Sequence, residues 1–274
     1  MKKLNIKNGL ATIILIIGAL IAILPFIWMI ITSLKDGGAI YKLPPEFWVK
    51  NPKWENYRYV ASKVPMTRYF INSLFVTIMI TSLTLVTTIL AAFAFSRLEF
   101  FGRDVIFTIL ISTMMVPGEV LIAPNFITLA RLGLINTMTS LYLPWIASAF
   151  SIFFLRQYFL SIPEQLYYAS KVDGASDFQY LIKIMVPYAK PALISIALLR
   201  VVNSWNEFLW PLLMVNTPDK RTLPVGLATF MTEAGAHYHW LMAYATVVIL
   251  PIIILYILLY KYIIQGFVLG GIKG

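Results

Sequence analysis

The chain has 274 residues, of which 59% are hydrophobic and only 12% are charged. A soluble domain carries about 25% charged residues, so this composition excludes a soluble two-domain protein and predicts a chain surrounded mostly by lipid. The net charge of +10 is spread over loops and ends, which favours contact with anionic lipid and excludes nucleic acid as a partner, while the absence of cysteine excludes disulfides and thiolate chemistry.

The N-terminal segment predicts an uncleaved first span. Basic residues precede an apolar run of about 23 residues, from Leu10 to Thr32, which is long enough to cross a membrane, and no small-x-small cleavage site follows it. The next loop, residues 33–69, contains Pro44-Pro45, Trp48 and Trp54. These residues predict a structured segment that lies at the membrane interface, where tryptophan is favoured.

Apolar runs predict six membrane-spanning helices within one transmembrane domain, residues 1–274. The spans are expected at about residues 10–32, 70–96, 105–124, 138–160, 191–215 and 241–264. Each run is close to the roughly 20 residues that a helix needs to cross the hydrocarbon core. Single segments in lipid satisfy their backbone groups only as helices, so the predicted fold class is all-α. Prolines inside several runs predict kinks.

An even number of spans places both ends of the chain on one side of the membrane, but charge does not decide which side. Eleven Lys and Arg residues fall on the N-terminal side and ten on the opposite side, with Arg200 inside a span. This difference is too small for the positive-inside rule. The lysines of the N-terminal tail, Lys2, Lys3 and Lys7, favour a cytoplasmic N-terminus.

The segment between the fourth and fifth spans, residues 161–187, is polar and predicts a helix, a turn and a second helix. Pro163 and Glu164 suit the first turn of a helix. Gly174 suits the left-handed backbone position that ends a helix, since glycine adopts this conformation without steric cost. We name this segment the hairpin.

The second helix of the hairpin is expected to begin at a capping box formed by Ser176 and Gln179. Its apolar residues are spaced to share one face, and Pro187 closes it; these apolar residues are Phe178, Leu181, Ile182 and Met185. One interpretation is an amphipathic connector on the membrane surface. The other is a docking element for a soluble partner, whose movement it would pass to the adjoining spans.

The fifth expected span contains a group of polar and aromatic side chains: Arg200, Asn203, Trp205, Asn206 and Glu207. Ionisable residues inside a span usually face the interior of a bundle or a wet cavity. The two amides and the carboxylate lie three to four residues apart and are expected to share a helix face. Such groups beside aromatic rings suit a sugar, so the last four residues are candidates for a translocation path. Polar contacts between helices are the alternative, and Arg200 favours a structural role.

Other polar residues predict no catalytic or metal site. His237 and His239 have only Glu233 nearby as a further metal ligand, so a plain outer loop is the better interpretation. Glu119 either lines the mouth of a path or lies at the interface. The sequence contains no phosphate-binding G-x-x-x-x-G-K-[ST] motif and no catalytic constellation, so the chain is not expected to be an enzyme or to hydrolyse ATP itself.

Within the hairpin, the stretch YASKVDGASDFQYLIKIMVP resembles the EAA loop of permeases from binding-protein-dependent ABC importers. The residues in register with that loop are Ala169, Asp173, Gly174, Ala175, Ile184 and Pro187. Three positions depart from its pattern: Tyr168 replaces Glu, Ser170 replaces Ala and Val186 replaces Leu. The missing carboxylate at Tyr168 implies that shape and apolar contact carry more of any docking.

The resemblance extends over nearly the whole chain to the maltose-type sugar permease family. The similar stretches, in order, are NSLFVT (Asn72–Thr77), AAFAFSRLEFFGR (Ala91–Arg103), LGLINT (Leu132–Thr137), LRQYFLSIPEQL (Leu155–Leu166), KPAL (Lys190–Leu193), SWNEFLWPL (Ser204–Leu212), TLPVGL (Thr222–Leu227) and QGFVLGGIKG (Gln265–Gly274). The resemblance implies a type I ABC importer permease in the cell membrane, with both termini and the hairpin cytoplasmic.

The resemblance also implies partners and a mechanism. A second homologous permease, two ATP-binding cassette subunits that bind ATP and Mg, and an extracytoplasmic solute-binding protein are expected. Coupling to the ATPase is expected at eight hairpin residues: Tyr168, Ala169, Ser170, Asp173, Gly174, Ala175, Ile184 and Pro187. The predicted cargo is a sugar or oligosaccharide carried by alternating access, and the sequence does not identify which one. The alternatives are glycerol phosphate or another polyol derivative and, from a different class, an ion-coupled transporter or channel.

Overall fold

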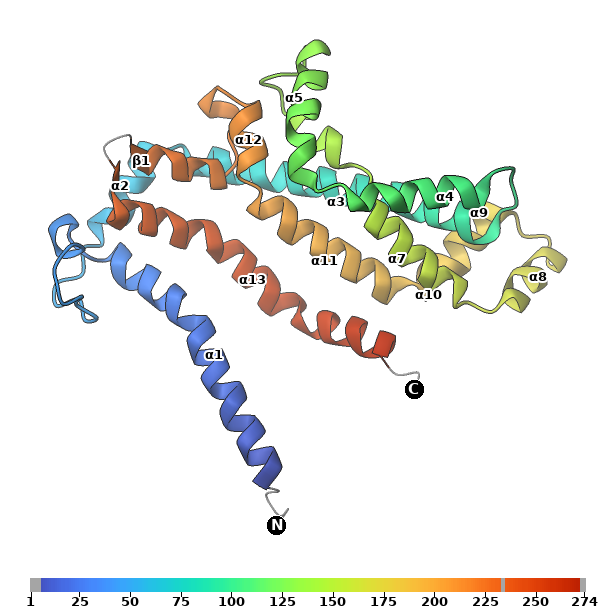
Figure 1. Cartoon of the computed structure of the whole chain (residues 1–274), viewed down its shortest axis with the longest axis horizontal. Coiled ribbons are helices and arrows are strands. Elements are labelled where there is room, and N and C mark those ends of the chain that lie inside the picture. The colour runs from blue at the N-terminus through green and yellow to red at the C-terminus, as the bar shows by residue number, and fades with distance from the viewer. Residues whose placement is uncertain (1–5, 233–234, 272–274) are drawn as a thin grey trace. The chain divides into compact units, whose positions relative to one another are not determined.

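The polypeptide folds into helices joined by turns and by one antiparallel pair of two-residue strands (Figure 1). The computed structural model describes the backbone of residues 6–232 and 235–271 and the side chains of residues 11–231 and 237–257. The α-helices are α1 (Ile6–Ser33), α2 (Glu55–Lys63), α3 (Met66–Arg97), α4 (Arg103–Ser112), α5 (Ile122–Arg131), α6 (Thr139–Tyr142), α7 (Ala149–Leu160), α8 (Glu164–Val172), α9 (Asp177–Tyr180), α10 (Val186–Tyr188), α11 (Lys190–Asn206), α12 (Leu209–Met214) and α13 (Tyr238–Gly271). Short turns of other helix types are η1 (Gly37–Ala39), η2 (Thr113–Met115), η3 (Gly118–Leu121), η4 (Leu143–Trp145), the π-helix η5 (Leu181–Met185), η6 (Pro218–Lys220) and η7 (Pro224–Phe230), and the strands are β1 (Met231–Thr232) and β2 (Gly235–Ala236).

The all-α class agrees with the expectation, and the six expected spans are the largest number that the described helices allow. Three described helices are long and apolar enough to cross a membrane alone, at Ala11–Ser33, Met66–Arg97 and Tyr238–Ile257. Up to six spans result if each bent helix pair counts as one, with bends of 96°, 45° and 77°. Composition indicates these spans because the paired helices are apolar enough together, but it carries no sign of the bends, so continuous helices were expected where the structure has broken ones.

The third expected span, residues 105–124, is not one continuous helix. The chain leaves the helical conformation at Val116, where φ is −87° and ψ is 117°, and then continues as a second helical arm, so that Arg103–Met115 and Gly118–Arg131 meet at 96°. The following residue is Pro117, and proline disfavours the helical conformation of the residue before it. The prediction of a kinked but single helix was therefore wrong here.

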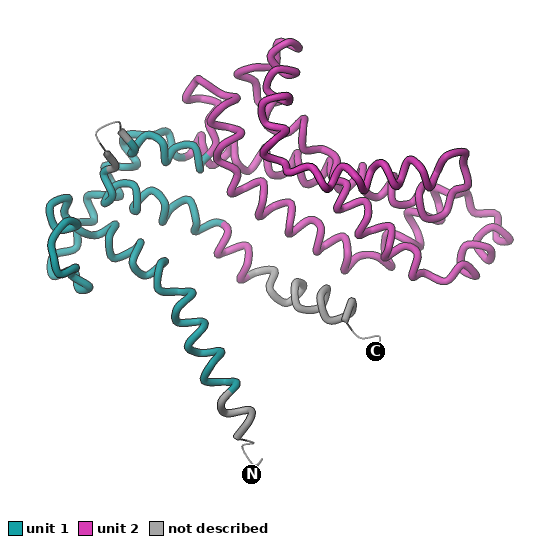
Figure 2. Tube along the Cα trace, viewed as in Figure 1, with its two compact units in different colours: residues 1–66, 223–251 teal, residues 67–222, 252–274 magenta. Residues whose placement is uncertain are grey.

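The described contacts divide the chain into two compact units (Figure 2). Unit 1 contains residues 1–66 and 223–251, and unit 2 contains residues 67–222 and 252–274. In unit 1 the expected structured loop is held by the buried Asn56 of α2, whose amide donates to the carbonyl oxygens of Ser33 (2.8 Å) and Lys35 (2.9 Å). Trp48 and Trp54 remain exposed, and their placement at the membrane interface stays a prediction.

A close contact in unit 1 requires glycine at position 226. Tyr244 is fully buried, and its hydroxyl donates to the carbonyl oxygen of Leu223 at 2.8 Å. A Cβ atom on Gly226 would collide with that hydroxyl and with the ring. This close approach explains glycine in the TLPVGL stretch.

We expect Gly226→Ala to destabilise the protein by about 1–3 kcal/mol, because overpacking a filled site forces the ring out of place. Thermal unfolding of the purified protein measures the change. Gly18→Ala is the matched control, since a Cβ there meets no heavy atom within 4 Å. The double variant G226A/Y244F removes the colliding oxygen and should regain part of the loss; no loss in G226A would contradict the role of this contact.

Unit 2 contains two larger apolar clusters of buried side chains and a smaller one of Phe95, Phe107 and Ile152. The first joins α3, α7, the hairpin and α11, and it comprises Ala92, Phe93, Leu155, Phe159, Ile162, Tyr180, Leu181, Met185, Ala189, Ala192 and Ile196. The second joins α3, α5, α6 and α12, and it comprises Val76, Ile80, Leu129, Leu141, Trp210, Met214 and Val215. Figure 1 shows α8 at one end of unit 2 and α12 towards the other. The two clusters share α3, where one contains Val76 and Ile80 and the other contains Ala92 and Phe93.

Hydroxyl groups of α3 stabilise the bend between α6 and α7. Thr84 donates to the carbonyl oxygen of Trp145 (3.0 Å), and Thr87 donates to that of Ile146 (2.7 Å). Both carbonyls lie where the helix is interrupted and therefore lack helical partners. Membrane-buried carbonyls need such partners because no bulk water reaches them.

Candidate functional site

The hairpin has the helix, turn and helix that the sequence predicts. Gly174 has φ of +78°, and the N–H of Ala175 donates to the carbonyl oxygen of Ser170 at 2.9 Å, which closes α8. The capping box is complete: the Ser176 side chain accepts from the N–H of Gln179 (3.2 Å), and the Gln179 side chain accepts from that of Ser176 (2.9 Å). The turn is therefore set by local chemistry.

The prediction that the second helix of the hairpin has a single apolar face is wrong. Leu181 and Met185 are buried, whereas Phe178 is 64% exposed and Ile182 is 46% exposed. Leu181, Ile182 and Met185 lie in a π-helix, Leu181–Met185, whose wider turn changes the angular spacing of their side chains. The core takes up Leu181 and Met185, and the other two side chains point outward.

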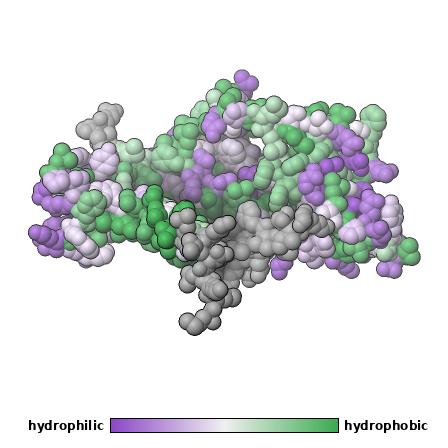
Figure 3. All heavy atoms as spheres, turned by 60° about the horizontal axis from the view of Figure 1, so that its bottom comes forward, coloured by the Kyte–Doolittle hydropathy of each residue, from purple (hydrophilic) through white to green (hydrophobic). Residues whose placement is uncertain are grey.

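Four large apolar side chains of the hairpin are at least 46% exposed, and we name them together the outer face: Tyr168, Val172, Phe178 and Ile182. Most of the predicted coupling residues lie at the surface as well, namely Tyr168, Ala169, Asp173, Gly174 and Pro187. Ala175 and Ile184 are half-buried. Ser170 is buried, and its hydroxyl donates to the carbonyl oxygen of Tyr167 at 2.7 Å. Figure 3 shows hydrophilic side chains gathered at the end of unit 2 that carries the hairpin.

Three side chains that the sequence reasoning missed connect the two arms of the hairpin. On α8, the Tyr167 hydroxyl donates to Asp177 Oδ1 at 2.8 Å, and Lys171 Nζ lies 2.7 Å from the same oxygen. These hydrogen bonds, first that of Lys171 and then that of Tyr167, lower the pKa of the Asp177 carboxyl. The bond to Asp177 likewise raises the pKa of Lys171. We name these three residues the clasp; the only sequence signal for it was the i, i+4 spacing of Tyr167 and Lys171.

The base of the hairpin is attached to the end of α3 by Arg97. Its Nη2 donates to the carbonyl oxygens of Phe159 (2.9 Å) and Ile162 (2.6 Å), and its Nη1 lies 3.9 Å from Glu164 Oε1. The Arg97 side chain is only 4% exposed, whereas that of Glu164 is 72% exposed. The carbonyl contacts therefore dominate, since an exposed ion pair contributes little.

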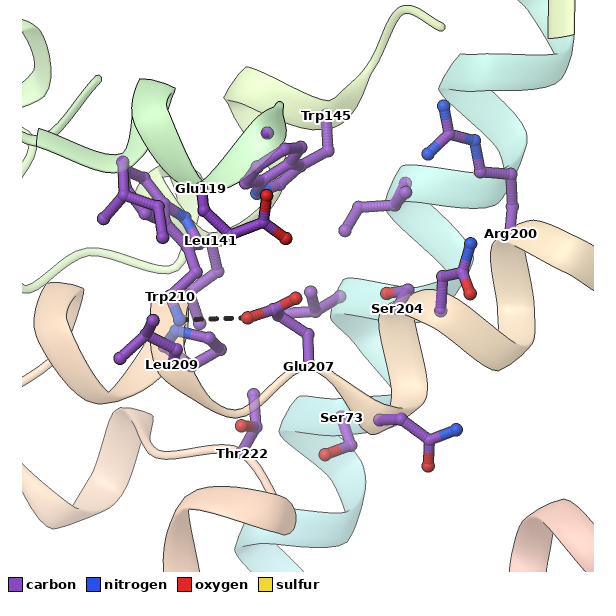
Figure 4. A pocket seen from close by; sticks show the side chains of 17 residues that line it. Ser73, Glu119, Leu141, Trp145, Arg200, Ser204, Glu207, Leu209, Trp210 and Thr222 are labelled. Atoms are coloured by element: carbon purple, nitrogen blue, oxygen red, sulfur yellow. Dashed lines mark hydrogen bonds between the residues drawn. The ribbon is translucent and has the colours of Figure 1, made fainter. Parts of the chain in front are cut away.

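A cavity of about 550 Å³ lies in unit 2 between α3, η3, α6, α11 and α12 (Figure 4). Its polar and charged lining consists of Ser73, Glu119, Arg200, Asn203, Ser204, Asn206, Glu207 and Thr222, with the indoles of Trp145 and Trp210 beside them. Figure 4 shows the carboxylates of Glu119 and Glu207 directed into the same opening. A volume of this size is typical of small-molecule sites, and the lining offers hydrogen-bond donors and acceptors beside aromatic surface.

Three of the four predicted path residues line this cavity: Asn203, Asn206 and Glu207. Asn203 and Asn206 lie three residues apart on α11, but the prediction that Glu207 shares their helix face is wrong, because α11 ends at Asn206 and Glu207 is extended, with φ of −66° and ψ of 121°. Glu207 instead lies two residues before α12, where its Oε1 accepts from the N–H of Trp210 at 3.0 Å. Trp205 is buried and packs edge-on against Phe70, with ring centroids 5.6 Å apart, rather than lining the cavity.

Among the described residues, no three potential metal ligands lie together. The rings of His237 and His239 are 6.2 Å apart, and Glu233 lies outside the described residues. Arg200 and Glu119 both line the cavity. The sequence left a position at the mouth of a path open for Glu119, and for Arg200 it favoured a structural role instead.

Comparisons with known proteins agree with this architecture. A family model described as "Binding-protein-dependent transport system inner membrane component" matches residues 84–268. The arabinooligosaccharides transport system permease protein AraQ of Halalkalibacterium halodurans is 34% identical, over 93% of each chain. The trehalose/maltose transport system permease protein MalG of Thermococcus litoralis is 35% identical, over 98% of this chain and 99% of that protein. Among solved structures, a chain of a bacterial ABC transporter involved in the import of the acidic polysaccharide alginate superposes with a TM-score of 0.81 at 26% identity, covering 96% of this chain and 98% of that one.

Proposed function

This chain belongs to the family of binding-protein-dependent transport system inner membrane components, and on that premise we propose that it lines the path by which an ATP-driven importer passes a neutral sugar or oligosaccharide. Membership of this family makes the chain a membrane-spanning permease, a transport subunit rather than an enzyme. The observation that carries the choice of cargo is the lining of the cavity.

The charges of the cavity favour a neutral cargo. Glu119 and Glu207 contribute two carboxylates, and Arg200 contributes one guanidinium. A phosphate group would meet a lining with more negative than positive charge, and like charges at close range oppose binding. Amide, hydroxyl and indole groups, in contrast, suit sugar hydroxyls and the apolar faces of sugar rings. These features support a sugar over glycerol phosphate.

In the proposed mechanism, two ATP-binding cassette subunits bind ATP and Mg on the cytoplasmic side, and their closure pushes the docked hairpin. A second homologous permease completes the path, and an extracytoplasmic binding protein delivers the sugar. Both termini and the hairpin are cytoplasmic. The outer face of the hairpin supports this docking because its exposed apolar side chains suit a groove on a soluble partner. Rigid-body movement of the partner then switches the packed helices between outward and inward openings.

The test of this function is uptake by the reconstituted importer. Proteoliposomes containing this chain, the second permease and the ATPase pair are supplied with the binding protein and labelled sugars. Uptake that needs both ATP and the binding protein is the expected result. Uptake by this chain alone, driven by an ion gradient, would overturn it in favour of a secondary transporter, and selective uptake of glycerol phosphate would overturn the sugar assignment.

Asn203 offers a specific test of the path. It lines the cavity, and no described residue forms a polar contact with its amide. We expect Asn203→Leu, which keeps the volume and removes the hydrogen-bonding group, to lower sugar uptake about 2- to 10-fold, the range for one hydrogen bond. Initial uptake rates over a range of sugar concentrations measure the change. Asn51→Leu, an exposed amide in unit 1, is the matched control; equal rates in both variants would remove Asn203 from the path.

A further inference from the structure

Packing alone attaches the first arm of the hairpin, α8, only weakly. Its only buried residue is Ser170. Two of its apolar side chains, Tyr168 and Val172, point outward as part of the outer face. A helix with so little buried surface has few contacts to fix its position, since most helical stability comes from packing one face. Apart from the packing of Tyr167 against the core, something other than burial must therefore hold α8 against the second arm.

The clasp supplies that attachment. Asp177 at the start of α9 accepts from both Tyr167 and Lys171 of α8, at 2.8 and 2.7 Å. Lys171 also lies 5.2 Å from the centre of the Tyr167 ring, so the two α8 side chains support one another. Asp177 is in the first turn of its helix, where a carboxylate is favoured by the helix dipole. Two groups of α8 thus converge on one carboxylate oxygen of α9 across the turn.

The clasp also connects α8 to the apolar core of unit 2. The Tyr167 ring packs edge-on against Tyr180, with ring centroids 5.0 Å apart. Tyr180 is fully buried in the cluster that contains Phe159 of α7 and Ile196 of α11. A continuous set of contacts therefore runs from the exposed arm, through Tyr167, to the helices on either side of the hairpin.

From these contacts we propose that Tyr167, Lys171 and Asp177 are positioning residues for energy coupling: they fix α8 on α9 so that force applied to the outer face moves the helices instead of bending the hairpin. The inference rests on the proposed function, because it assigns a role in the same ATP-driven transport.

The experiment measures the number of sugar molecules imported per ATP hydrolysed by the complete importer in proteoliposomes. This ratio is informative because a loss of folded complex lowers uptake and hydrolysis together and leaves the ratio unchanged. Lys171→Met, Asp177→Asn and Tyr167→Phe each remove one member of the clasp. Lys171→Arg keeps the charge and the donor. Lys183→Met is the matched control. Lys183 is an exposed lysine of the same hairpin, and its side chain forms no described polar contact.

We expect the ratio to fall about 2- to 5-fold in Lys171→Met and in Asp177→Asn, as befits a partly exposed ion pair. The double variant K171M/D177N should fall little further than either single variant, because both remove the same interaction. Lys171→Arg should restore most of the ratio, and Lys183→Met should equal wild type. Wild-type ratios in both single variants, or additive losses in the double variant, would overturn the inference. A wild-type importer without ATP-dependent uptake would instead refute the proposed function.

Discussion

We expect Gly174→Val to reduce ATP-driven sugar uptake about 10-fold while the amount of protein in the membrane stays close to wild type. Gly174 has φ of +78°, and a Cβ there would meet no heavy atom within 4 Å. The cost is therefore backbone strain alone, roughly 1–2 kcal/mol for a residue with a Cβ in this conformation. The hairpin relieves that strain by changing the turn, which displaces α8 and the outer face. Uptake and ATP hydrolysis in proteoliposomes measure the effect, and hydrolysis should fall less than uptake.

Two variants test whether the loss comes from backbone strain rather than from the added side chain, and whether it depends on the strain lying in the hairpin. Gly174→Asn should retain most of the activity, since asparagine tolerates the left-handed conformation better than a β-branched residue. Gly133→Val introduces the same strain where φ is +68° and space is open, but outside the hairpin. Wild-type uptake in Gly174→Val, or an equal loss in Gly133→Val, would refute a specific role of the hairpin in coupling.

The turn of the hairpin was predictable because its signals are local. Gly174 adopts the left-handed conformation, and Ser176 and Gln179 form both bonds of the capping box. Each feature depends on residues within a few positions of one another. Apolar runs likewise revealed the membrane-spanning segments, because length and composition alone determine whether a helix suits lipid.

The errors arose where the backbone departs from a regular α-helix. Period-3.6 reasoning placed Ile182 and Met185 on one face, but both lie in the π-helix, where Ile182 is exposed and Met185 is buried. It also placed Glu207 on the face of Asn203, but the helix ends between them. Departures of this kind depend on packing against other segments. Periodicity within one segment therefore carries no sign of them.

Contacts between distant segments were the least predictable. The cavity brings Glu119, Trp145 and Glu207 together from three separate parts of the sequence. Arg97 contacts carbonyl groups more than sixty residues away, and no pattern of side chains marks a carbonyl as a partner. Family resemblance supplied the general function, but these specific partners required the fold.

Arg97→Met should be the most destabilising substitution at the base of the hairpin, costing about 3 kcal/mol. The Arg97 guanidinium is almost fully buried and donates to the carbonyl oxygens of Phe159 and Ile162, at the end of α7 and just beyond it. The Phe159 oxygen also accepts from the N–H of Ile162 at 3.2 Å, so the Ile162 oxygen is the acceptor that loses its described partner, and a buried acceptor without a partner costs roughly 1–3 kcal/mol. Thermal unfolding and the yield of assembled importer after extraction measure the loss.

Three further variants assign this loss to the carbonyl contacts. Arg97→Lys should recover only part of the stability, because one ammonium group lacks the planar fork of the guanidinium. Glu164→Gln should change stability little, since its side chain is mostly exposed and lies 3.9 Å from Arg97. Arg131→Met, at an exposed arginine, controls for loss of charge. If Glu164→Gln destabilised as much as Arg97→Met, the ion pair would be the main attachment, and the hairpin would be joined to α3 through its exposed edge rather than through the end of α7.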